Sequence, residues 1–68
     1  MDNFVAGNTY TNLNGSTYYL EKIFENGDMR FRRTGDRWTL RAHGVKMYPD
    51  GLIEWDYSTG GHWPKTPW

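Results

Sequence analysis

The chain has 68 residues and no cysteine, and its basic and acidic side chains balance to a formal net charge of zero. This length excludes two separate hydrophobic cores, and the absence of cysteine excludes disulfides and thiol chemistry. Aliphatic side chains are scarce but aromatic residues make up 18% of the chain, so we expect aromatic rings to fill the core of one small domain.

Turn-forming residues recur at even intervals and separate short segments rich in Tyr, Trp, Phe and Thr. They are Asn14-Gly15, Asn26-Gly27 and the segments 34–36, 49–51 and 59–61. This rhythm predicts an all-β fold, a strongly curled antiparallel β-meander of five or six short strands. We expect it to form a small, partly open SH3-like barrel, with a three-stranded sheet and packed tail as the alternative.

The segment 16–25 fits either a strand or a helix beginning at Ser16, and the hairpin pattern around Asn26-Gly27 favours the strand. Asn-Gly favours a two-residue type I′ turn, which pairs Phe24 with Met29. That register gathers apolar side chains on one face, namely Leu20, Phe24, Met29 and Phe31. Charged side chains then occupy the opposite face.

The next two turns also have testable registers. A loop of even length after residue 33 keeps Leu40 and Ala42 on the same face as Phe31. Residues 49–51, Pro-Asp-Gly, predict a three-residue hairpin loop with a left-handed glycine, which pairs Met47 with Ile53. After Tyr57 we expect an irregular segment, so that residues 1–58 form the domain and residues 59–68 a C-terminal tail packing on it.

Basic residues are concentrated in the middle of the chain. Between positions 29 and 46 lie Arg30, Arg32, Arg33, Arg37, Arg41 and Lys46, with Asp36 as their acidic neighbour. Strand alternation predicts a binding surface on the outer face of two adjacent strands, formed by Arg30, Arg32, Arg37 and Arg41. The alternative is a solvated face that is partly neutralised by Glu21, Glu25 and Asp28. Trp63 and Trp68 in the tail are further candidates for contact with a partner.

Catalytic residues are not indicated by this sequence. His43 and His62 are the imidazoles, and neither has the spacing of a metal site or of a Ser-His-Asp arrangement. We therefore expect no enzyme activity, no metal and no cofactor. Without a leader-like start or a long apolar run, we also expect a cytoplasmic protein that does not enter a membrane.

The segment from Phe4 to Tyr10 reads F-x-x-G-x-T-Y and resembles the start of many short β-rich proteins encoded by phages and other mobile elements. The resemblance implies a small accessory protein that acts by binding. With the arginine pattern, it predicts a non-catalytic binding module or inhibitor that docks on a host or defence protein. The alternatives are a nucleic-acid-binding small barrel, with arginine on phosphates, and a carbohydrate-binding module using Trp63 and Trp68.

Overall fold

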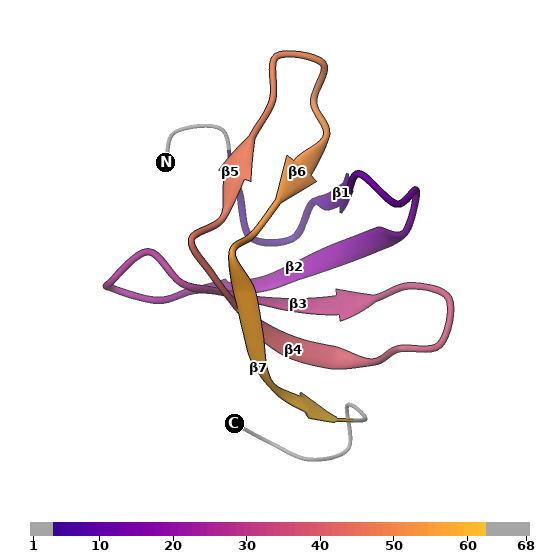
Figure 1. The fold of residues 1–68 in the computed structure, drawn as a ribbon. Coiled ribbons are helices and arrows are strands. Elements are labelled where there is room, and N and C mark those ends of the chain that lie inside the picture. The colour runs from indigo at the N-terminus through magenta and orange to yellow at the C-terminus, as the bar shows by residue number, and fades with distance from the viewer. Residues whose placement is uncertain (1–3, 63–68) are drawn as a thin grey trace.

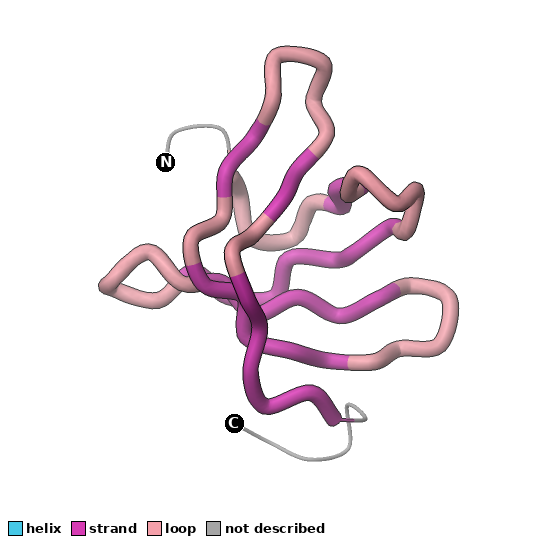
Figure 2. Tube along the Cα trace, viewed as in Figure 1, coloured by secondary structure: helices cyan, strands magenta, loops and turns pink. Residues whose placement is uncertain are grey.

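The computed structural model describes residues 4–62, which form strands connected by turns and contain no helix (Figures 1 and 2). The strands are β1 Thr9–Thr11, β2 Thr17–Ile23, β3 Met29–Arg33, β4 Thr39–His43, β5 Lys46–Met47, β6 Ile53–Glu54 and β7 Tyr57–His62. The predicted all-β class is confirmed, and so is the strand, rather than a helix, within residues 16–25.

The strands form two antiparallel sheets. The main sheet has the order β1-β2-β3-β4-β7, and the β5–β6 hairpin is a separate small sheet that stands away from it in Figure 1. β1 to β4 follow one another as the predicted meander, and a single bridge from Asn12 to Ile53 connects the end of β1 to β6. The described strands do not form a closed barrel.

β7 occupies the segment where irregular structure was expected. It pairs with β4 through Ala42 opposite Ser58 and Thr39 opposite His62, so it is an edge strand of the main sheet. The main sheet therefore continues past the expected domain limit at residue 58. Residues 63–68 of the proposed tail, with Trp63 and Trp68, lie outside the described residues.

Three hairpin turns share one geometry. In each, a three-residue loop ends in a glycine with positive φ whose N–H donates to the carbonyl oxygen of the residue before the loop; the glycines are Gly15, Gly27 and Gly51. The prediction was right for Gly51 but wrong for Asn26-Gly27, which is not a type I′ turn. A type I′ turn needs positive φ at both central residues, and Asn26 does not have it. Its side chain instead accepts a hydrogen bond from the Asp28 N–H.

A β-bulge at Glu21 changes the register between β2 and β3. Leu20 pairs with Phe31, but Lys22 pairs with Arg30, so Glu21 has no partner across the ladder. An extra residue of this kind moves the side chains beyond it to the other face. The expectation that Phe24 belongs to the core is therefore wrong, whereas Leu20 and Phe31 do face each other as core residues.

The other predicted registers are confirmed. The β3–β4 loop has the even length expected, which places Phe31 opposite Leu40 and Met29 opposite Ala42. In the small sheet Met47 pairs with Ile53, as the three-residue loop requires.

One continuous core lies between a face of the main sheet and the β5–β6 hairpin. Its buried residues are Phe4, Tyr18, Leu20, Met29, Phe31, Leu40, Ala42, Val45 and Ile53. At its centre the rings of Phe31 and Trp55 stack at 5.4 Å, and Tyr18 meets Trp55 edge-on at 5.1 Å. Each large side chain buried here contributes about 1.5–3 kcal/mol. The expected aromatic core is therefore present.

Candidate interaction face

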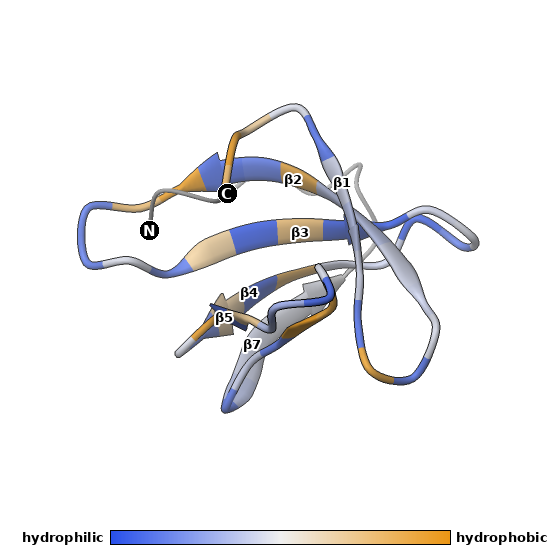
Figure 3. Cartoon of the chain, turned by 90° about the horizontal axis from the view of Figure 1, so that it is seen from above, coloured by the Kyte–Doolittle hydropathy of each residue, from blue (hydrophilic) through white to orange (hydrophobic). Residues whose placement is uncertain are grey.

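The side of the main sheet that faces away from the core carries charged and aromatic side chains, which we call the arginine face. It comprises Tyr19, Glu21, Arg30, Arg32, Arg41, His43 and Tyr57. Its members alternate with core residues because successive side chains of a strand point to opposite sides. Figure 3 shows this alternation of hydrophilic and hydrophobic residues along β3. Three of the arginines predicted from the sequence are thus neighbours on adjacent strands.

Glu21 holds two arginines of β3 in place. Its two carboxylate oxygens lie 3.0 Å from the Arg30 Nε and 3.2 Å from the Arg32 Nε. The bulge explains this arrangement, because a residue without a cross-strand partner can lean between two side chains of the next strand. Both guanidinium groups are therefore fixed before any partner arrives.

Asp28 plays the same part for β4. Its Oδ2 lies 3.0 Å from the Arg41 Nε and 2.8 Å from the His43 Nδ1, and it accepts a hydrogen bond from the Asn26 amide. Burial raises the pKa of Asp28, but the hydrogen bonds from Asn26 and Arg41 and the charge interaction with His43 outweigh it. The pKa of this carboxyl therefore lies below its usual value of 3.8.

Aromatic rings support the same cations. The Arg41 guanidinium carbon lies 3.9 Å from the centre of the Phe24 ring, and the Arg32 carbon lies 5.3 Å from that of Tyr19. His43 stacks on Tyr57 at 4.4 Å with an angle of 15° between the rings. Cation–π contacts of this kind contribute about 0.5–1 kcal/mol at exposed sites and restrict side-chain motion.

Not every predicted site residue belongs to the arginine face. Arg37 lies in the β3–β4 turn, and its side chain is exposed beyond the end of the sheet. Trp63 and Trp68 lie outside the described residues. The expectation that Arg37 belongs to the outer strand face is therefore wrong. Arg37 is the last residue of the four-residue loop 34–37, and its N–H donates a hydrogen bond to the Arg33 carbonyl oxygen.

His43 and Phe24, which both lie beside Arg41 or its carboxylate partner, were not expected at this surface. The prediction that His43 lies at a strand end is correct, since it is the last residue of β4. Because it follows Arg41 by two residues on that strand, its side chain points to the same face as that of Arg41. Phe24 was assigned to the core, and no feature of the sequence reveals the bulge that brings it beside Arg41.

The β3–β4 turn contains a second ion pair. Arg33 donates from Nε and Nη2 to the two carboxylate oxygens of Asp36, at 2.8 and 2.6 Å. Asp36 also accepts a hydrogen bond from the Trp38 N–H. The hydrogen bonds from Arg33, with a smaller contribution from Trp38, outweigh partial burial and lower the pKa of Asp36 to about 2.

The lowered pKa values of Asp28 and Asp36 predict that the free energy of unfolding falls in acid. Both pKa values are lower in the folded protein, so the unfolded chain binds more protons than the folded one. The stabilisation by Asp36 is complete above pH 3.8 and is lost as the pH falls towards 2. Carboxyl ¹³C titration by NMR should give a midpoint near 2 for Asp36 and one below 3.8 for Asp28. Midpoints at or above 3.8 would contradict the two networks.

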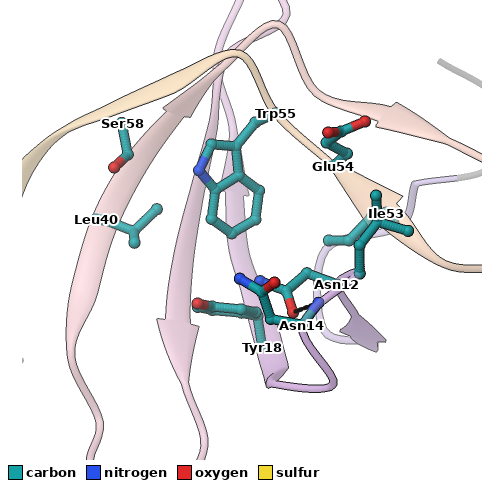
Figure 4. A pocket seen from close by; sticks show the side chains of 9 residues that line it. Asn12, Asn14, Tyr18, Leu40, Ile53, Glu54, Trp55 and Ser58 are labelled. Carbon is teal, nitrogen blue, oxygen red and sulfur yellow. Dashed lines mark hydrogen bonds between the residues drawn. The ribbon is translucent and has the colours of Figure 1, made fainter.

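An open groove of about 390 Å³ lies on the other side of the main sheet, between the β1–β2 loop, β4 and β6 (Figure 4). Trp55 projects into it towards Tyr18 and Asn14. Among its lining side chains, the Asn12 side-chain oxygen accepts hydrogen bonds from the Asn14 and Ser16 N–H groups. Glu54 accepts a hydrogen bond from the Tyr48 hydroxyl. The groove is therefore a mixed apolar and polar surface on the opposite side of the main sheet from the arginine face.

Among residues 4–62, no three His, Asp or Glu side chains are grouped closely enough to hold a metal ion, and no helix is long and apolar enough to span a membrane. Comparison with known proteins found no matching family model, no matching curated protein and no matching solved structure. The interpretation of the site therefore rests on its own geometry.

Proposed function

We propose that this protein is a non-catalytic binding module that docks on a protein partner through the arginine face. One observation carries the proposal: Arg30, Arg32 and Arg41 lie on adjacent strands, and each is held against a carboxylate before binding. Held side chains lose little conformational entropy when a partner arrives, so their contacts contribute more to affinity. Arginine and tyrosine are also the residues that most often dominate binding energy at protein interfaces.

The balance of charge favours a protein partner over a nucleic acid. Glu21 and Asp28 lie within the same network as the arginines, so the face is mixed in charge rather than strongly positive. A phosphate backbone would meet these two carboxylates as repulsive neighbours. A protein surface with its own acidic, hydrogen-bonding and aromatic groups complements the arginines, the carboxylates and the exposed Tyr57 ring.

We propose a cytoplasmic, phage-type accessory protein or inhibitor whose partner is a host or defence protein, which the resemblance of residues 4–10 supports. We also propose that the two sheets together form a partly open SH3-like barrel. The bridge between Asn12 and Ile53 supports this, because it joins β1 to the β5–β6 hairpin.

The proposal predicts that changing the arginine face abolishes docking without unfolding the protein. Partners captured from the source cells should be purified, and their binding measured by calorimetry against wild type and the double variant Arg32→Gln/Tyr57→Ser. Tyr57 is 60% exposed and the Arg32 side chain 33%, so the variant should retain the wild-type circular dichroism spectrum. We expect the affinity of the true partner to fall by about tenfold or more.

The matched control is Lys46→Gln/Leu13→Ser, which removes one cation and one exposed apolar side chain away from the arginine face. It should bind the partner as tightly as wild type. A partner that binds both double variants equally well shows that docking does not use the arginine face, and the proposal is then wrong.

A further inference from the structure

A small hollow opens where β2 and β3 meet the β3–β4 turn, at one end of the arginine face. Its volume is about 370 Å³, and it is lined by Tyr19, Arg32, Arg33, Thr34 and Arg37. Three arginines thus line a space large enough for a small ligand, and the Arg33 guanidinium is already bound to Asp36. The carboxylates paired with these arginines are Glu21 and Asp36.

The charges around this hollow do not cancel. Asp36 is fully engaged by Arg33, and Glu21 is shared between Arg30 and Arg32. Arg37 forms no ion pair with any residue in the described part of the chain. The hollow therefore keeps a net positive charge, in contrast to the middle of the arginine face, where Asp28 lies beside Arg41.

The backbone of Arg37 provides an independent observation. Its φ is +65°, and it is the one residue other than glycine with positive φ among residues 4–62. L-residues with a β-carbon adopt this conformation at a cost of about 1 kcal/mol or more, and glycine or asparagine is usual there. The turn alone would favour glycine at this position, so the turn does not require an arginine here.

We propose that this hollow binds a phosphate group, with Arg37 and Arg32 as its principal contacts. The Arg32 Nε is directed to Glu21, which leaves its terminal nitrogens for a ligand, and no ion pair within the described residues holds the Arg37 guanidinium. Guanidinium groups bind the oxygens of phosphate through paired, charge-assisted hydrogen bonds. The Tyr19 ring forms a wall of the hollow beside Arg32, where it can contact the group that carries the phosphate.

The site is tested on the isolated protein with inorganic phosphate as the probe. Titration at constant ionic strength, followed by NMR of the arginine Nε–H signals, should shift the Arg32 and Arg37 signals to saturation. Equal concentrations of acetate should not do so. Because the test needs no protein partner, failure of the docking proposal and failure of this one are distinguishable.

Variants separate a specific site from general attraction of anions. Arg37→Gly should weaken phosphate binding about tenfold, as loss of a charged hydrogen-bonding group does. Its melting temperature should stay the same or rise, because glycine accepts the positive φ. Lys46→Gln removes the same charge from β5 and should leave phosphate binding unchanged.

Two further ligands identify the source of the phosphate. A phosphoserine peptide represents a modified partner protein, and adenosine monophosphate represents a free nucleotide; the tighter of the two identifies the natural class. Equal shifts with phosphate and acetate, or wild-type affinity in Arg37→Gly, would overturn the proposal.

Discussion

Replacing Phe31 with alanine is expected to lower the free energy of unfolding by about 3–5 kcal/mol. Phe31 is fully buried at the centre of the core, stacked on Trp55 and flanked across the sheet by Leu20 and Leu40. Truncation removes these contacts and leaves a cavity. A domain of this size has only about 5 kcal/mol in total, so a large fraction of the variant should be unfolded. Urea denaturation followed by tryptophan fluorescence and circular dichroism measures the change.

The matched control is Phe24→Ala, which tests the register as well as the core. The same truncation at Phe24 removes a ring that contacts Arg41 and stands outside the core, so we expect a cost of about 1 kcal/mol. If Phe24→Ala destabilised the protein as much as Phe31→Ala, Phe24 would belong to the core. That result would contradict the bulge at Glu21 and favour the two-residue turn predicted from the sequence.

The bulge also marks the limit of what the sequence allows to be predicted. Alternation of apolar and polar residues fixes which side of a strand is buried only until the next insertion, because one extra residue reverses the two faces. The prediction that Leu20, Phe31 and Leu40 belong to the core is correct. Leu20 precedes the inserted residue, and the other two lie on strands without it. Ile23 and Phe24 follow it, and neither belongs to the core: Ile23 is 38% exposed and Phe24 lies beside Arg41.

Alternation along the strands also made it possible to predict that these arginines share one face. Arg30, Arg32 and Arg41 alternate with core residues on two strands whose connecting loop has even length, so their common side follows from the spacing alone. Glu21 and Asp28 were expected near these arginines, but the contacts that each of them makes with two side chains were not. Glu21 reaches two arginines only because it bulges, and Asp28 reaches Arg41 and His43 from the end of a neighbouring turn.

β7 was missed because its sequence is unlike a strand. Residues 57–62 include two adjacent glycines, which have low β propensity and which mark the segment 59–61 as a turn in the sequence. Glycine suits this edge strand for a packing reason, since it allows another group to approach the backbone closely. Here the approaching group is the indole ring of Trp38. The same side chain also packs against the hydrophobic core.

This contact predicts that Gly61→Ala is strongly destabilising. A β-carbon at position 61 would lie 2.5 Å from the Trp38 Nε1 and 2.7 Å from its Cζ2, which is closer than such atoms can approach. The ring is rigid and partly buried, so either Trp38 leaves its place on the core or β7 separates from β4. We expect a loss of about 2–3 kcal/mol in unfolding free energy, the usual cost of overpacking.

Gly35→Ala is the matched control, because Gly35 has neither positive φ nor any neighbour within 4 Å of an added β-carbon. It should be neutral or slightly stabilising, since alanine restricts the unfolded chain. The effect at Gly61 should nearly vanish in a Trp38→Ala background, where the colliding ring is absent. A Gly61→Ala protein as stable as Gly35→Ala would mean that Trp38 does not rest on β7, and that this edge strand is held by its backbone pairing with β4 alone.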